Sequence, residues 1–204
     1  ADMDEEKIAR GAENFIDNLA SRALGFLGND DLDQVQLREK FRVLLNESFD
    51  INTLARFALG RYWRVASEEQ REAYTRLFRK MIIEVYSKRF NDYEGQRFEL
   101  QDARMASDTD AMVTSRVLPP ESEDGQTIKI AWRLRYKDSS YEIVDVIVEC
   151  VSMSLTKRSD FSAVIQRGGG DVSVLLAHLR EKYDKDSQTR DTTPKPKQKA
   201  ASSQ

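Results

Sequence analysis

The sequence predicts an α+β domain in which a twisted antiparallel sheet of about four strands carries several packed helices. In residues 127–136, apolar and basic side chains alternate with a period of two, which is typical of a strand with one buried and one solvated face. Residues 141–153 are apolar at both parities, which predicts a central strand with both faces covered. Residues 137–140, between these segments, predict a hairpin turn.

Two further strands are expected before this hairpin. Residues 97–103 place Phe98 and Leu100 at alternate positions, and residues 111–118 follow a turn at 108–110. Because the connections between successive strands are short, the strands should form an antiparallel meander.

Helices are predicted before the strands from apolar residues that recur at spacings of three and four. The first helix occupies about 25 residues and ends at Gly28. A second helix starts near Asp31. Asp50 is placed as the N-cap of a short third helix, which ends at Gly60.

A long helix should begin at Ser67, because Ser67 and Gln70 fit the capping box, in which each side chain binds a free backbone amide of the other residue. Its apolar stripe consists of Tyr74, Leu77, Phe78, Met81, Ile82, Val85, Tyr86 and Phe90. Such a stripe indicates core packing, but part of it could line a ligand cavity instead. The sequence leaves both alternatives open.

After the last strand the apolar period changes, and residues 152–166 predict a helix that stops at Gly168. The run from Gly168 to Gly170 follows a helix and lacks the Lys-Ser/Thr of a phosphate-binding loop, so we interpret it as a turn between helices. Asp171 should cap the last helix. Residues 1–184 then form one domain, and residues 185–204, which lack aromatic, Leu, Ile and Val side chains, predict a disordered hydrophilic tail.

The charge pattern excludes a strong electrostatic attraction to nucleic acid. The 204 residues include 32 basic and 35 acidic side chains, well mixed along the chain, with a net charge of −3. We therefore predict no nucleic-acid partner. Cys150 is the only cysteine, so no intrachain disulfide forms, and no run approaches the ~20 apolar residues of a membrane span.

No catalytic or metal-binding set emerges from the sequence. His178 is the only histidine and lies beside leucines on the last helix, which indicates a residue at the flank of the core. The acidic residues lack the spacing of a calcium loop, and we predict no metal. Asp145, within a strand, could act as a base, but a structural carboxylate paired with Arg133 or Arg135 is the favoured interpretation.

A short connector rich in arginine and aromatic residues follows the third helix. Arg56, Arg61 and Arg64 surround Tyr62 and Trp63. This pattern is compatible with a docking or headgroup-facing patch and equally with a solvated rim around a buried tryptophan.

Several of these segments, taken together, resemble the MlaC family, also called the toluene-tolerance family. The motifs are Phe-Ala-Leu-Gly-Arg-Tyr-Trp-Arg at 57–64, the capping box at 67–70, Tyr86, Val-Asp-Val-Ile-Val-Glu at 144–149, Val-Ser-Met at 151–153, Arg-Ser-Asp-Phe at 158–161, and Gly169-Gly170. The resemblance runs from about Phe41 to Lys182. The family prefers Gly where this chain has Cys150, so the thiol could narrow the local cavity.

The resemblance implies a soluble periplasmic carrier with phospholipid as its cargo. Members of this family shuttle phospholipid between an outer-membrane lipoprotein complex and an inner-membrane ABC transporter, which maintains outer-membrane lipid asymmetry. The family fold is a twisted antiparallel sheet with helices that enclose an apolar pocket. On this basis we expect no enzymatic activity and no cofactor other than the bound lipid, and a monomer is the default for a shuttle.

If the resemblance holds, the long helix and the concave face of the sheet should share one dry cavity. The expected lipid-binding residues are Phe57, Trp63, Phe78, Met81, Ile82, Val85, Tyr86, Phe98, Val113, Ile130, Trp132, Val146, Val148 and Met153. Which parity of each strand faces the lipid is not fixed by the sequence.

Three other functions remain open. A carrier or accessory protein for hopanoids or other polycyclic lipids would share the sheet-and-helix pattern. A small-molecule enzyme on the same scaffold would use Asp145 and a tyrosine as its acid–base pair. A pure interaction module would use the arginine-rich connector as its surface.

Overall fold

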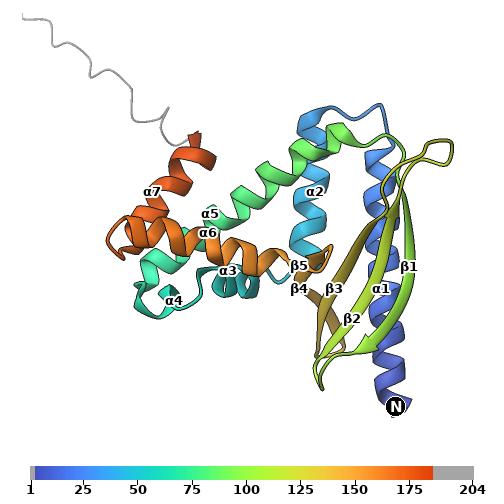
Figure 1. Cartoon of the computed structure of the whole chain (residues 1–204), viewed down its shortest axis with the longest axis horizontal. Helices are drawn as coiled ribbons and strands as arrows, with labels where there is room; N and C mark the ends of the chain where they lie inside the picture. The colour runs from blue at the N-terminus through green and yellow to red at the C-terminus, as the bar shows by residue number, and fades with distance from the viewer. Residues whose placement is uncertain (1–2, 186–204) are drawn as a thin grey trace, which may run out of the picture.

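A five-stranded antiparallel sheet with helices on and beside it makes up residues 3–185, which the computed structural model describes (Figure 1). The strands are β1 (Arg97–Met105), β2 (Asp110–Leu118), β3 (Ile128–Lys137), β4 (Ser140–Val148) and β5 (Val151–Ser152). They are paired in the order β1-β2-β3-β4-β5. The predicted α+β class and antiparallel meander are confirmed, and the strand beyond the predicted four contains only two residues.

One long helix lies along the sheet, and the other helices continue to its side (Figure 1). The helices are α1 (Met3–Leu27), α2 (Gln34–Ser48), α3 (Ile51–Leu59), α4 (Tyr62–Val65), α5 (Glu68–Ser87), the 3₁₀ helix η1 (Lys88–Asp92), α6 (Met153–Arg167) and α7 (Val172–Tyr183). Helix α1 packs against β1 and β2, whereas α3, α5, α6 and α7 pack mainly on one another. Of the predicted tail, only Lys185 lies within the described residues.

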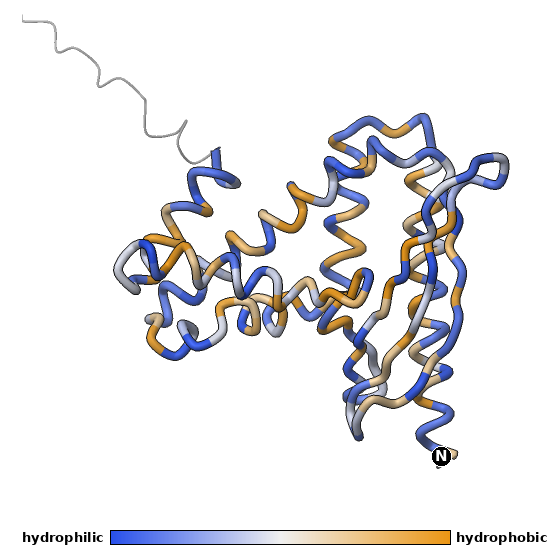
Figure 2. Tube along the Cα trace, in the orientation of Figure 1, coloured by the Kyte–Doolittle hydropathy of each residue, from blue (hydrophilic) through white to orange (hydrophobic). Residues whose placement is uncertain are grey.

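Local sequence chemistry sets most helix boundaries. Both hydrogen bonds of the capping box at Ser67 are present, and the side chains of Asp50 and Asp171 accept backbone amides at the starts of α3 and α7. The second helix begins later than predicted, because Asp33 forms a capping box with Gln36 that fixes its start there. Figure 2 shows apolar and polar segments alternating along the helices, as expected for helices with one buried face.

The apolar residues form two cores that meet at Phe49. In the helical core, Tyr74 is fully buried, its ring meets those of Phe78 and Phe161, and its hydroxyl donates to the Ala55 carbonyl at 2.8 Å. This burial raises the pKa of Tyr74 well above its ordinary value. The sheet core is formed by one face of α1 packed on four fully buried strand residues, namely Ala111, Val113, Leu134 and Ile143.

The prediction that residues 141–153 form a central strand was wrong. The strand in this segment, β4, pairs with β3 on one side, but on the other side only its last two residues pair with β5. A bulge at Val144 shifts the register, so that Ile143 faces Leu134 whereas Asp145 faces Arg133. The bulge reverses the alternation of side chains, which explains why apolar residues occur at both parities.

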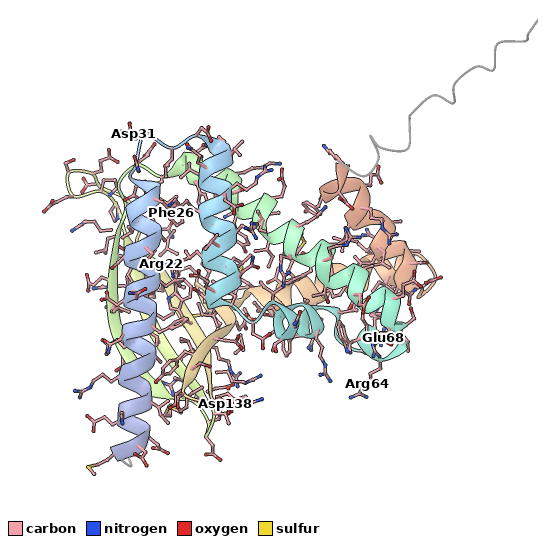
Figure 3. All side chains as sticks on the ribbon, turned by 180° about the vertical axis from the view of Figure 1, so that it is seen from behind. Arg22, Phe26, Asp31, Arg64, Glu68 and Asp138 are labelled. Carbon is pink, nitrogen blue, oxygen red and sulfur yellow. The ribbon has the colours of Figure 1, made fainter. Side chains whose placement is uncertain are left out.

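The hairpin turn between β3 and β4 has the geometry expected of a two-residue connection. Asp138 and Ser139 both have positive φ angles, 49° and 62°, which a turn of this type requires at both central positions. Asp138 lies in this turn, and Asp31 lies at the opposite end of the sheet (Figure 3).

The predicted pairing of Asp145 with Arg133 or Arg135 was also wrong. Both arginines bind Asp110 instead, with Nε to carboxylate oxygen distances of 2.8 Å and 3.0 Å. Asp145 accepts hydrogen bonds at the start of α6, from the hydroxyls of Ser152 and Ser154. The carboxylate is therefore structural, as expected, but its partners are hydroxyls and amides.

The Asp110 carboxylate should make stability depend on pH in the acid range. Burial raises the pKa of Asp110, but the hydrogen bonds and charges of Arg135 and Arg133 outweigh burial and hold that pKa below its ordinary value of 3.8. A depressed pKa contributes stability above the unfolded-state value, and this contribution is lost as the pH falls through the folded-state value. We expect Asp110→Asn to lower the free energy of unfolding at neutral pH by about 2 kcal/mol.

The same variant should lose stability less steeply than the wild type below about pH 4, because it lacks the proton uptake of Asp110. Urea unfolding of both proteins across this range measures the effect. Parallel stability curves for the two proteins would contradict the assignment.

Gly60 ends α3 in a backbone conformation that only glycine adopts easily. Its φ and ψ are 62° and −133°, and a Cβ atom there would lie 3.2 Å from Nε of Arg158. We expect Gly60→Ala to lower the free energy of unfolding by about 2 kcal/mol. Gly25→Ala is the matched control, because Gly25 lies within α1 with open space around it, and it should be neutral or slightly stabilising. Equal stability of the two variants in urea unfolding would refute the expectation.

Candidate functional site

One face of the sheet carries apolar side chains across all four long strands. Residues directly opposite each other in an antiparallel pair point to the same face, and Trp132 lies opposite both Val113 and Val146. Ile130 lies opposite Val148 in the same way. This apolar face comprises Phe98, Leu100, Ala103, Met105, Ala111, Val113, Val117, Ile128, Ile130, Trp132, Leu134, Ile143, Val146 and Val148. The register thus places the six predicted strand residues of the site on one face.

Helix α1 covers only part of this apolar face. On the covered part, Ala111, Val113, Leu134 and Ile143 are fully buried, and the β1 residues Phe98, Leu100, Ala103 and Met105 are half-buried against the same sheet core. Among the other residues of the face, we call Ile128, Ile130, Trp132, Val146 and Val148 the open half. Trp132 and Val146 also pack against the edge of the sheet core. Ile128 is 38% exposed and the other four side chains are half-buried. An apolar surface of this kind on a folded chain is typical of a binding site.

The polar atom of Trp132 has a partner within the apolar face. Its indole nitrogen donates to the Ser115 hydroxyl at 2.9 Å, and that hydroxyl donates to the Ile130 carbonyl at 3.1 Å. Ser115 is only 2% exposed. Because the indole N–H is satisfied within the sheet, the ring can present an apolar surface to a ligand at little cost.

The predicted residues of the long helix α5 divide between core and boundary. Phe78 and Met81 are buried in the helical core, and the Phe78 ring packs on Phe161. Ile82 and Val85 are half-buried against the same core. These four residues therefore pack with other helices, and they belong to a different cluster from the sheet residues of the predicted site.

Tyr86 is half-buried near the end of α5, where burial raises the pKa of its hydroxyl. The guanidinium carbon of Arg89 lies 5.9 Å from the centre of its ring. Beyond it, the ring of Phe90 meets those of Phe26 and Phe41, which fixes the end of the long helix against α1 and α2.

The other predicted residues lie on the helical side of the molecule. Phe57 is 41% exposed on α3, and Trp63 is half-buried on α4 with the Arg71 guanidinium 5.3 Å from its ring centre. Met153 is half-buried at the start of α6. Arg64, next to Trp63, points away from the body of the molecule at the end far from α1, near Glu68 (Figure 3).

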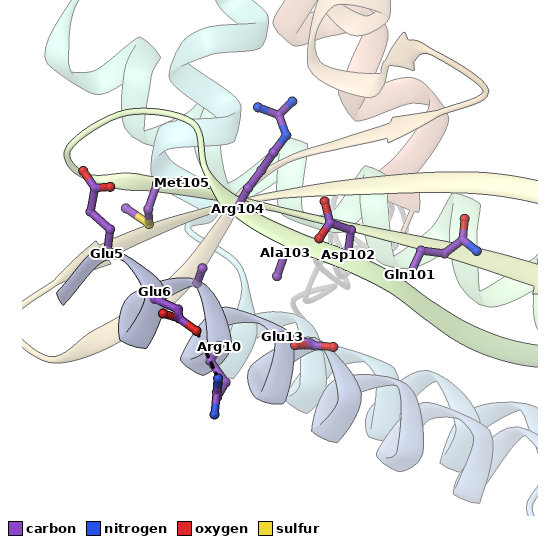
Figure 4. A pocket seen from close by; sticks show the side chains of 10 residues that line it. Glu5, Glu6, Arg10, Glu13, Gln101, Asp102, Ala103, Arg104 and Met105 are labelled. Carbon is purple, nitrogen blue, oxygen red and sulfur yellow. Dashed lines mark hydrogen bonds and ion pairs between the residues drawn. The ribbon is translucent and has the colours of Figure 1, made fainter. Parts of the chain in front are cut away.

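Two surface hollows lie away from these residues. One, of about 450 Å³, lies between the first turns of α1 and strand β1 (Figure 4), and its lining includes Glu5, Glu6, Glu13, Asp102 and Arg104. The other, of about 420 Å³, lies between α5 and α7. The charged lining of the first hollow suits water better than acyl chains.

Two further observations concern metal-binding groups and membrane-spanning helices among the described residues. Within residues 3–185, no three His, Cys, Asp or Glu side chains are grouped so that they could hold a metal ion. None of the helices described for these residues combines the length and the apolar character needed to cross a bilayer.

A family model described as "MlaC protein" matches residues 17–181, which is most of the chain. The chain belongs to the MlaC family. Its fold is similar to that of a solved phospholipid-binding protein from Ralstonia solanacearum in complex with a phospholipid, with a TM-score of 0.73 and 21% sequence identity. The similarity covers 85% of this chain and 97% of the Ralstonia chain. This MlaC chain therefore shares the α+β architecture of that structure over nearly its whole described length.

Two residues at the open half of this MlaC chain were not predicted from the sequence. Ile128 extends the apolar face toward solvent, and Ser115 holds the Trp132 ring. Ile128 has the same parity as Ile130 in the strand and could have been included on that signal. Ser115 offers no signal, because a serine in an alternating strand reads as solvent-facing until the register is known.

Proposed function

We propose that this protein carries phospholipid, with the acyl chains held on the open half of the apolar face. The observation that supports the proposal most directly is the half-buried apolar set of Ile130, Trp132, Val146 and Val148 on one face of a sheet in an MlaC fold. The Ralstonia relative, whose fold this chain shares, was solved with a phospholipid bound.

A carrier is needed because acyl chains are poorly soluble in water. Each methylene group exposed to water costs about 0.8 kcal/mol, so that one chain of about 16 carbons costs on the order of 12 kcal/mol. Free lipid therefore crosses an aqueous compartment very slowly. An apolar surface that replaces water around the chain removes most of this cost, provided that other side chains close over the lipid.

Family membership supports a more specific proposal. We propose a periplasmic monomer that shuttles phospholipid between an outer-membrane lipoprotein complex and an inner-membrane ABC transporter, which would maintain lipid asymmetry. In this role the protein catalyses no covalent reaction and needs no cofactor besides its cargo. Ile82, Val85, Tyr86 and Met153, which are all half-buried, are proposed to contact the lipid on the helical side.

Native mass spectrometry of protein purified without detergent tests the proposal, followed by organic extraction and identification of what is released. Phospholipid adducts are the expected result. Hopanoid-type lipid would instead support the related carrier for polycyclic lipids. An unliganded mass, together with failure to take phospholipid from liposomes, would overturn the proposal and return attention to an enzyme or an interaction module.

A further inference from the structure

The helices α3, α4 and α6 carry an excess of positive charge in a chain that is negative as a whole. Residues 51–67 and 153–167 contain six basic residues and one acidic residue, whereas the net charge of the chain is −3. Helix α3 packs directly on α6 (Figure 1), so the two segments lie side by side. Within the first segment, Arg56 and Arg61 are exposed. This part of the molecule favours an anionic partner.

Three exposed apolar side chains lie on the same helices or on the strand that leads into α6. Phe57 is 41% exposed on α3, Leu155 is 52% exposed in the first turn of α6, and Val151 is 51% exposed in β5. We call the six residues Arg56, Phe57, Arg61, Val151, Leu155 and Arg158 the α3–α6 surface. Burying these three side chains on contact with a partner would be favourable.

Specific contacts hold two of the arginines at this surface. Nε of Arg158 donates to the Phe57 carbonyl at 2.9 Å, and the guanidinium carbon lies 4.0 Å from the centre of the Phe57 ring. Nη2 of Arg61 donates to the Tyr62 hydroxyl at 3.0 Å. No carboxylate neutralises either arginine in the ion pairs of residues 3–185. Their positive charge therefore remains available to an external anion.

The α3–α6 surface continues into the open half of the apolar face. Val151 pairs directly with Val148, and Val148 pairs with Ile130. Because opposite residues share a face, Val151 extends the apolar face at the edge of the sheet. Leu155 lies four residues further on, in the helix that starts at Met153. The α3–α6 surface is therefore joined to the open half through Val151.

We propose that the α3–α6 surface docks the protein directly on the headgroup region of a bilayer that contains anionic phospholipid. This inference rests on the proposed carrier function and extends it. Basic side chains would bind lipid phosphates while Phe57, Leu155 and Val151 enter the interface, the combination found in proteins that bind at membrane surfaces. A lipid bilayer is favoured over an acidic protein because Val151 of this surface pairs with Val148 of the face proposed to hold acyl chains.

The net negative charge of the chain constrains how docking occurs. At long range an anionic bilayer repels the molecule as a whole, so attraction acts only when the α3–α6 surface faces the bilayer within about one Debye length, ~8 Å at physiological ionic strength. Binding should therefore be orientation-specific and should weaken strongly with added salt.

The test is sedimentation of the full chain with vesicles of phosphatidylcholine alone or of an equal mixture of phosphatidylcholine and phosphatidylglycerol. The wild type should bind the mixed vesicles more tightly. Arg56→Gln/Arg61→Gln should weaken that binding about twenty-five-fold, from about fivefold for each arginine near an anionic surface. Leu155→Ser, at a side chain that is already half in solvent, should weaken it about fivefold.

Matched controls test whether any loss of binding is specific to this surface or follows from removing charge or apolar surface anywhere on the molecule. Arg79→Gln/Arg104→Gln removes two exposed arginines of α5 and β1, and Val35→Ser removes an apolar side chain that is 76% exposed on α2. Both should bind mixed vesicles like the wild type. Equal loss in the controls, or wild-type binding that is absent or identical on both kinds of vesicle, would overturn the inference.

Lipid retention separates this inference from the proposed function. The Arg56→Gln/Arg61→Gln protein should still carry lipid in native mass spectra, because neither arginine belongs to the apolar face. A wild-type protein that retains lipid but does not sediment with the mixed vesicles would overturn docking and leave the carrier function intact.

Discussion

Ile130→Gln is expected to lose bound phospholipid while the protein stays folded. Ile130 lies in the open half, opposite Val148, and is half-buried. In the empty protein the amide of glutamine remains hydrated, so the free energy of unfolding should change by less than about 1 kcal/mol. Against an acyl chain the same amide loses its water without gaining a partner, which should weaken lipid retention about a hundredfold. Native mass spectrometry measures occupancy, and thermal unfolding measures stability.

Ile147→Gln provides the matched control for this substitution. Ile147 is also half-buried, but it pairs with Ala131 and points to the opposite face of the sheet. It should retain lipid at the wild-type level. A folded Ile130→Gln protein that keeps its lipid, or equal loss from Ile147→Gln, would place the lipid elsewhere. If Ile130→Gln unfolds, the milder Val148→Thr tests the same face with almost unchanged volume.

The sequence predicted the elements whose signals are local. The caps at Asp50, Ser67 and Asp171 were placed correctly because a cap depends on a side chain and on amides two or three residues away. The strand residues of the predicted site lie on one face because alternation along each strand holds wherever the strand is regular.

Features that depend on contacts between distant segments could not be predicted. The bulge at Val144 reverses the parity of β4, and no local signal distinguishes it from a strand with two apolar faces. Phe78 and Val85 belong to the same apolar stripe on α5, but their surroundings differ. Phe78 packs on Phe161, more than 80 residues later, whereas Val85 lies near the boundary of the core. Periodicity identifies the buried side of a helix, but it does not show which other element covers that side.

Asp145 connects the two parts of the molecule, and its removal should loosen that connection. Its carboxylate accepts the Ser152 hydroxyl at 2.5 Å and both the hydroxyl and the backbone amide of Ser154, at 2.7 Å and 3.2 Å. These donors form the first turn of α6, whose residues Phe161 and Ile165 belong to the helical core. A carboxylate at this end of a helix also interacts favourably with the helix dipole. Strand β4 and helix α6 are thus joined by one side chain.

We expect Asp145→Ala to lower the free energy of unfolding by about 3 kcal/mol, because several hydrogen bonds to a charged group are lost and buried donors at the start of α6 lose their acceptor. Asp145→Asn keeps one acceptor oxygen and should cost about half as much. Urea unfolding measures both values, and hydrogen exchange should show faster opening of residues 153–157 than of the α5 core.

Ser154→Ala is the control for this prediction, because it removes only one of the hydrogen bonds that Asp145 accepts. Ser154 is 5% exposed and donates its hydroxyl only to Asp145 among the hydrogen bonds of residues 3–185, so its loss should cost about 1 kcal/mol. If the carboxylate organises the junction, Asp145→Ala must cost clearly more than Ser154→Ala. Equal costs would mean that the junction is held by apolar packing of Phe161 and Ile165, with Asp145 serving only one hydroxyl.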